Sequence, residues 1–212
     1  MPAGFIGDCD EPTLILRHIF DSILPVIADE TREYFPIRNS AELKVFDLGT
    51  GAGLPAIPLA ILFPDTQFFC IDSQEKRLRF VQESAHELGL NNITICHSAV
   101  EDFPKKFGSI KADVIIFRAF RKILASLELA CFIDRIDSKV LYWRSQPILF
   151  SEVGLSRVKD LGYQVEKFVR FDSVESLVSR GVYEFTKKSA CKPGFPRHYR
   201  KISRDPLVEK ES

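Results

Sequence analysis

The 212-residue sequence lacks an apolar run long enough to cross a membrane. Its longest apolar stretch, residues 54–63, contains two prolines and is far below the ~20 residues that a membrane-spanning helix needs. The N-terminus has no basic start followed by an apolar run, so we expect no signal peptide. These absences predict a soluble, cytoplasmic protein without membrane association.

Cysteine pairs with the spacing of a metal or redox site are also lacking. The five cysteines are odd in number and widely scattered (Cys9, Cys70, Cys96, Cys131 and Cys191). This pattern predicts reduced thiols and no metal centre. Cys70 and Cys96 fall in runs typical of β-strands, and we expect both to be small core residues.

The chain has no net charge, with 29 basic and 29 acidic residues, but its charges are unevenly distributed. Residues 1–48 carry nine acids against four lysines and arginines, whereas residues 187–204 carry seven basic residues and no acid. Such a basic segment is typical of a tail that contacts a polyanion, and the alternative is a solvated end. Pro193 and Pro196 are expected to keep this segment from forming a helix.

Internal repeats and low-complexity linkers are absent, so we expect one domain over residues 1–188 and a basic, flexible tail over residues 189–212. Apolar periodicity predicts strands at 44–48, 67–71, 93–96, 112–117, 140–143, 165–171 and 181–186, and helices at 11–28, 54–63, 74–89, 120–132 and 150–161. Strands that alternate with crossover helices favour a Rossmann-like α/β fold. We therefore expect a mostly parallel seven-stranded sheet, helices on both faces and a terminal antiparallel strand pair.

The strongest local motif is VFDLGTGAG at residues 45–53, in which an apolar strand meets Gly49, Gly51 and Gly53 before an apolar helix. In an open α/β sheet, ligands bind beyond the carboxyl ends of the strands, where this loop lies. Glycines let the backbone approach a ligand closely. The free N–H groups of the following helix start can bind an anion.

Two nucleotide-binding motifs do not fit this loop. The NAD fingerprint requires a glycine at position 54, where this chain has Leu54. A phosphate loop requires a lysine followed by serine or threonine, and neither is present here. An acidic residue before G-x-G-x-G instead resembles the first motif of class I S-adenosylmethionine-dependent methyltransferases. Asp72, at the end of the next strand, is placed to accept hydrogen bonds from ribose hydroxyls. The alternative is a glycine-rich turn without a ligand.

Five longer sequence strings resemble one family of class I methyltransferases more specifically. They are RHIFDSI (17–23), VFDLGTGAGLPAIPLAILFPD (45–65), IDSQEKRLRFVQESAHELGLNN (71–92), VEDFP (100–104) and RAF (118–120). In order and spacing they resemble the ribosomal RNA small subunit methyltransferase G family, also called glucose-inhibited division protein B, over residues 5–187.

This resemblance implies methyl transfer from S-adenosyl-L-methionine to N7 of one guanine in 16S ribosomal RNA. The partner would be 16S rRNA or the small ribosomal subunit, and we expect a monomer. Carried over by position, the cofactor-binding residues are Gly49, Leu54, Val100, Glu101 and Arg118. The loop argument above adds Gly51, Gly53 and Asp72. Val100 and Glu101 would hold the adenine ring, and Arg118 would take a positioning role at the boundary between cofactor and substrate. Arg144, Arg197, Arg200 and Lys201 are the candidate contacts to RNA.

Each of three assignments has an alternative. Leu54 would otherwise be a core residue, Glu101 a surface carboxylate in a turn, and Arg118 a cation that ties down Asp113. The chain also departs from the family pattern at Ala56, Phe117 and Arg144-Ser145. Only sixteen residues precede Arg17, so we expect a short helical lead-in over residues 1–43.

Guanine N7 has a free lone pair, so its methylation requires no general base and depends mostly on positioning. The sequence agrees, because it lacks both the Pro-Cys of cytosine-C5 enzymes and the Asp/Asn-Pro-Pro-aromatic string of amino-nitrogen enzymes. Two other functions stay open. One is a class I methyltransferase for a small molecule or protein, and the other is an inactive S-adenosylmethionine-binding module.

Overall fold

The computed structural model describes residues 11–28, 35–171 and 180–204 of the chain. The chain forms two compact units, residues 1–99 and 100–212. Its strands make a seven-stranded sheet in the order β3-β2-β1-β4-β5-β7-β6. Strand β7 runs antiparallel to both β5 and β6, whereas β1, β2 and β3 pair in parallel, as do β4 and β5. The predicted mostly parallel sheet with a terminal antiparallel pair is confirmed.

The first unit is a parallel three-stranded sheet with crossover helices. Its elements are β1 (Lys44–Leu48), α3 (Ala56–Leu62), β2 (Gln67–Asp72), α4 (Glu75–Glu87) and β3 (Ile93–His97). The buried face of α4 consists of Leu78, Val81 and Ala85, as the helical spacing predicts. Cys70 and Cys96 are fully buried in this core, as expected.

The N-terminal helical stretch has three parts, α1 (Glu11–Leu14), the π-helix η1 (Ile15–Phe20) and α2 (Asp21–Ile27). The predicted helix over 11–28 is confirmed, and it ends two residues after Pro25. The π-helical turn was not predicted, because apolar periodicity does not distinguish it from an ordinary helix.

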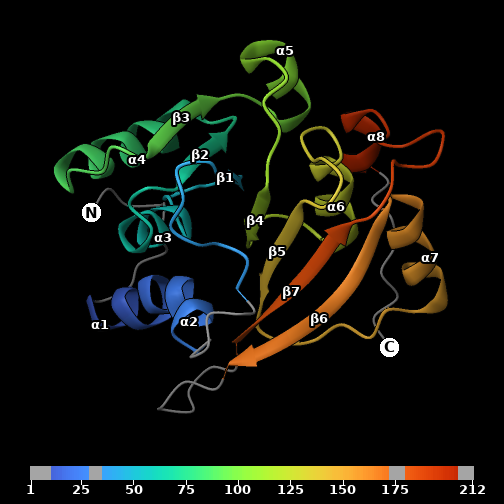
Figure 1. Cartoon of the computed structure of the whole chain (residues 1–212), viewed down its shortest axis with the longest axis horizontal. Helices are drawn as coiled ribbons and strands as arrows, with labels where there is room; N and C mark the ends of the chain where they lie inside the picture. Colours follow the sequence, from blue (N-terminus) through green and yellow to red (C-terminus); the bar gives the residue numbers. More distant parts are fainter. Residues whose placement is uncertain (1–10, 29–34, 172–179, 205–212) are drawn as a thin grey trace. The chain divides into compact units, whose positions relative to one another are not determined.

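The second unit contains four strands and the helices between them. Its elements are η2 (Val100–Asp102), α5 (Phe103–Phe107), β4 (Val114–Arg118), α6 (Ile123–Ala130), β5 (Lys139–Arg144), α7 (Glu152–Asp160), β6 (Tyr163–Phe171), β7 (Arg180–Lys187) and α8 (Tyr199–Arg204). Every residue of α6 is buried. Helix α7 packs beside β6, and α8 packs on α6 (Figure 1).

The segment after β7 corrects one expectation. Pro193 and Pro196 were expected to prevent a helix, yet α8 begins three residues beyond Pro196 and buries Ile202. The prolines precede the helix, where a missing backbone N–H costs no hydrogen bond. The segment is also held to the end of α7 through its backbone, since Lys192 N donates to Asp160 O at 2.8 Å.

None of the helices in the described parts of the chain is long and apolar enough to cross a membrane.

Candidate functional site

The glycine loop after β1 has the backbone conformation that its sequence predicts. Gly49, Gly51 and Gly53 all have positive φ angles, of 72°, 58° and 78°. A Cβ on Gly53 would lie 2.5 Å from Ile57 Cδ1, so this glycine is required for packing against α3. A Cβ on Gly51 would meet only Gly49 O, at 3.8 Å. The loop at Gly51 therefore borders open space in which a ligand can approach the backbone.

The acid at the end of β1 supports this loop from within. Asp47 is buried, and its Oδ2 accepts a hydrogen bond of 2.8 Å from Thr50 Oγ1. Burial raises the pKa of the neighbouring Cys70 thiol, and Asp47 raises it further. The Cys70 thiol is therefore neutral at physiological pH.

Asp72 joins the loop directly, as its spacing predicts. Its Oδ2 accepts from Gly51 N at 3.2 Å and from Arg77 Nη1 at 3.4 Å, and its Oδ1 accepts from Gln74 N at 2.9 Å. Asp72 thus fixes both the glycine loop and the start of α4. A carboxylate has about four acceptor positions, so one remains for a ligand hydroxyl. Arg77 was not singled out as a site residue, although it lies in the DS-x-x-KR part of the family resemblance.

Leu54 lies in the turn before α3 and is only half-buried. Its side chain retains surface that a ligand can cover.

Val100 and Glu101 lie in η2 of the second unit. Val100 is buried, and Glu101 is half-buried with its Oε2 shielded from solvent and without a hydrogen-bond partner in the described residues. Burial raises the pKa of Glu101, and Asp102 raises it further, whereas Arg121 and His198 lower it. A shielded carboxylate oxygen without a donor is not a solvated surface group. It is able to accept a ligand N–H.

Arg118, the last residue of β4, is half-buried. The Asp113 carboxylate, which Arg118 was alternatively expected to hold, accepts a hydrogen bond of 2.9 Å from Arg135 Nε.

The four candidate RNA contacts differ in environment. Arg200 and Lys201 are exposed on α8, and Arg144 is half-buried with Nε 3.0 Å from Gln146 O. Arg197 instead forms an internal ion pair with Glu128 of α6, which sequence reasoning missed. Its Nε lies 2.8 Å from Glu128 Oε1 and its Nη2 lies 2.7 Å from Oε2. Arg197 therefore attaches the segment after β7 to α6 within the second unit.

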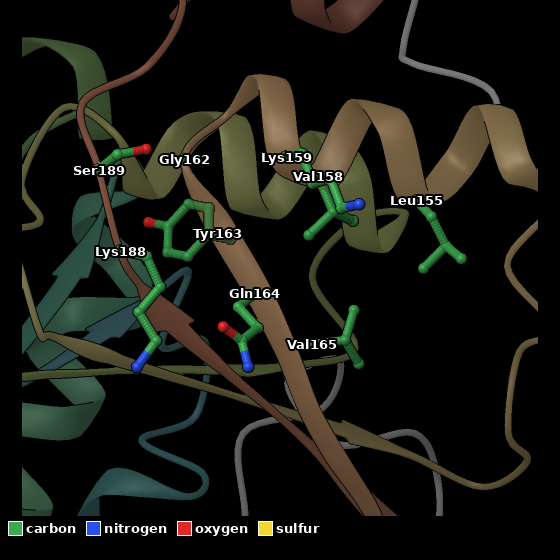
Figure 2. Close-up of a pocket in the computed structure, with 9 residues that line it drawn as sticks. All are labelled: Leu155, Val158, Lys159, Gly162, Tyr163, Gln164, Val165, Lys188 and Ser189. Atoms are coloured by element: carbon green, nitrogen blue, oxygen red, sulfur yellow. The ribbon is translucent and has the colours of Figure 1, made fainter.

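A pocket of about 410 Å³ lies elsewhere in the second unit, between α7, β6 and the segment after β7. Figure 2 shows its lining residues, which are Leu155, Val158, Lys159, Gly162, Tyr163, Gln164, Val165, Lys188 and Ser189. None of the predicted site residues lines it, so we assign it no part in cofactor binding.

Comparisons with known proteins agree with the loop geometry. Residues 3–146 match the family described as rRNA small subunit methyltransferase G. The chain is 28% identical to a ribosomal RNA small subunit methyltransferase G of Thermoanaerobacter sp., over 93% of this chain and 80% of that protein. It is 40% identical to the protein of that name from Psychromonas ingrahamii, over 54% of this chain and 48% of that protein.

A solved structure supports the fold. The crystal structure of a SAM-dependent methyltransferase from Aquifex aeolicus is similar with a TM-score of 0.51 and 21% sequence identity, over 78% of this chain and 98% of that one.

Proposed function

The chain belongs to the rRNA small subunit methyltransferase G family, and from this premise we propose that it methylates N7 of one guanine in 16S ribosomal RNA with S-adenosylmethionine. The observation that carries the proposal is the direct hydrogen bond between Asp72 and Gly51. This bond joins an acceptor for ribose hydroxyls to a glycine loop with an open face. Ribosomes assemble in the cytoplasm, and we place the protein there as a monomer.

The residues of the first unit fit the cofactor. The half-buried Leu54 and the backbone of Gly49, Gly51 and Gly53 provide a surface that a ligand can approach closely. Asp72 retains an acceptor position for a ribose hydroxyl. When bound, S-adenosylmethionine supplies an electrophilic methyl group on a sulfonium.

The family resemblance assigns the adenine ring to Val100 and Glu101. The buried Val100 side chain offers apolar contact to a ring face. The unpartnered Oε2 of Glu101 is an acceptor of the kind that an exocyclic amine requires. We propose that Arg118 positions the guanine, because alkylation of a free lone pair needs alignment more than proton transfer.

A methyl-transfer assay tests this function. Unmodified small ribosomal subunits and radiolabelled S-adenosylmethionine should give label in 16S rRNA. The rRNA should then break at one guanine after borohydride and aniline treatment, which cleaves at N7-methylguanine. Label in a protein or small molecule alone would favour a different methyltransferase. Cofactor binding without any transfer would favour an inactive binding module.

We further propose that Arg144, Arg200 and Lys201 contact RNA phosphates. The double substitution Arg200→Gln and Lys201→Gln should reduce the slope of log affinity against log salt by ~0.7–0.9 for each lost phosphate contact. Filter binding to 16S rRNA across a salt series measures this slope. Lys159→Gln, which removes an exposed lysine from α7, is the matched control and should leave it unchanged. An equal slope for both variants would indicate that the cations of α8 are merely solvated.

A further inference from the structure

Two cysteines that lie far apart in the sequence meet in the second unit. Cys131 follows the end of α6, and Cys191 follows β7. Lys187 Nζ lies 3.4 Å from the Sγ of each, and both thiols face the Leu161 carbonyl.

The lysine between them is a buried cation that is held in place from several sides. Lys187 is 2% exposed, and its Nζ lies 2.8 Å from both Asp134 Oδ2 and Leu161 O. The same ammonium lies 4.5 Å from the centre of the Tyr163 ring, and the Tyr163 hydroxyl donates to Asp134. Burial lowers the pKa of Lys187, but the Asp134 carboxylate and Cys191 raise it, with an upward net shift. Lys187 therefore stays charged beside the two sulfurs.

The two thiols are chemically unequal. The hydrogen bond from Cys131 lowers the pKa of Cys191 against the effect of burial, and the Lys187 ammonium lowers it further, to about 6. Burial raises the pKa of Cys131. At neutral pH, Cys191 is a thiolate beside a neutral thiol. Both residues are half-buried, unlike the fully buried Cys70 and Cys96.

We propose that Cys191 and Cys131 form a peroxide-reactive pair, in which Cys191 is the attacking thiol and Cys131 the resolving thiol. The proposal goes beyond the methyltransferase function, because none of these residues belongs to the proposed site. The two sulfurs and the cation 3.4 Å from each of them carry it. A disulfide here would fasten the start of the C-terminal segment to the end of α6.

The reaction balances with a hydroperoxide as oxidant. The Cys191 thiolate attacks the peroxide, an S–O bond forms and the O–O bond breaks, and the departing oxygen leaves as hydroxide or alkoxide and takes up a proton. Cys131 then attacks the sulfenic sulfur, an S–S bond forms, the S–O bond breaks and water leaves with the Cys131 proton. Two thiols and one hydroperoxide thus give one disulfide, one alcohol or water, and one further water. An added dithiol reverses the change.

Peptide mapping of the full chain after brief treatment with hydrogen peroxide tests the pair. We expect a cross-linked peptide that contains Cys131 and Cys191 and that dithiothreitol releases. In Cys131→Ala, a sulfenic acid should accumulate on Cys191, where dimedone traps it. Cys191→Ser should abolish both products. The buried Cys70 and Cys96 are internal controls and should stay reduced.

Alkylation by iodoacetamide tests the Cys191 thiolate separately from oxidation. At pH 6 half of Cys191 should be thiolate, against ~0.3% of a thiol with the ordinary pKa of ~8.5. A thiolate of lower pKa is less nucleophilic, and the logarithm of its rate constant falls with pKa by a Brønsted slope of ~0.4–0.5. This offsets most of the gain in thiolate fraction, so Cys191 should be alkylated about tenfold faster than a free thiol at pH 6. The midpoint of the rate should move to higher pH in Cys131→Ala, which removes the neighbouring thiol that lowers the pKa of Cys191.

Two results would overturn the proposal. One is a Cys191 alkylation rate at pH 6 no faster than that of a free thiol. The other is peroxide treatment of the wild-type chain that oxidises cysteines without a Cys131–Cys191 bond and without a sulfenic acid on Cys191. Both are measured on the unmodified protein, so neither depends on whether a variant folds.

Discussion

Replacing Arg197 with methionine is expected to lower the free energy of unfolding by about 3–5 kcal/mol. Glu128 is fully buried in α6, and the Arg197 side chain is 12% exposed. The substitution removes both side-chain hydrogen bonds and, within the described residues, leaves the Glu128 carboxylate with only the bond from Arg197 N, at 2.9 Å. An uncompensated buried charge accounts for most of the loss. Urea unfolding of the variant and the wild type measures it.

Two matched variants separate this effect from simple loss of a surface cation. Lys192→Ala breaks the ion pair with Asp160, in which the lysine side chain is 67% exposed. It should cost less than about 1 kcal/mol, because the buried Asp160 carboxylate keeps its bond of 3.1 Å from Arg157 Nη1. The double variant Arg197→Met and Glu128→Leu should recover much of the lost stability, because no charge stays buried. A cost for Arg197→Met as small as that for Lys192→Ala would contradict the structural role of the pair.

Replacing Asp72 with alanine is expected to weaken binding of S-adenosylmethionine by about 1.5–3 kcal/mol, or roughly 10- to 150-fold. The change removes the proposed acceptor for a ribose hydroxyl and also releases Gly51 N and Gln74 N. The glycine loop then loses the hydrogen bond from Gly51 N that fixes its backbone. Isothermal titration calorimetry of the folded variant measures the affinity.

Glu75→Ala is the control for this experiment. Glu75 begins α4 close to Asp72, but its side chain is 61% exposed and pairs with Arg79. Its loss should leave cofactor affinity unchanged. If Asp72→Ala changes affinity less than twofold, Asp72 only fixes the loop and the helix start, and the ribose assignment is wrong.

Most of the fold was predictable because its elements follow regular apolar patterns. The strands and helices from β1 to β7 begin and end within about three residues of the predicted ranges, apart from η2 and α5. Those two helices were missed because Val100–Phe107 is too short to show a period. Helix α8 was missed because the two prolines before it were read as interrupting it.

The candidate site was predictable only where its contacts are local in the motif. Gly51 follows β1 and Asp72 ends the adjacent β2, so strand order alone brings them together. Glu128 and Arg197 are 69 residues apart, and nothing near either residue indicates a partner. The same holds for Cys131 and Cys191, because the spacing of the scattered cysteines does not indicate that these two meet. Such pairs depend on tertiary packing.

The position of β7 has a consequence for biosynthesis. Among the described strands β7 is the last in the chain, yet it lies inside the sheet, between β5 and β6. While a nascent chain is still growing, β5 has no antiparallel neighbour and presents an open row of backbone donors and acceptors. Such an edge readily pairs with other chains. This half of the sheet can therefore be completed only after β7 has been synthesised. Translation that stops before Arg180 would release an aggregation-prone fragment.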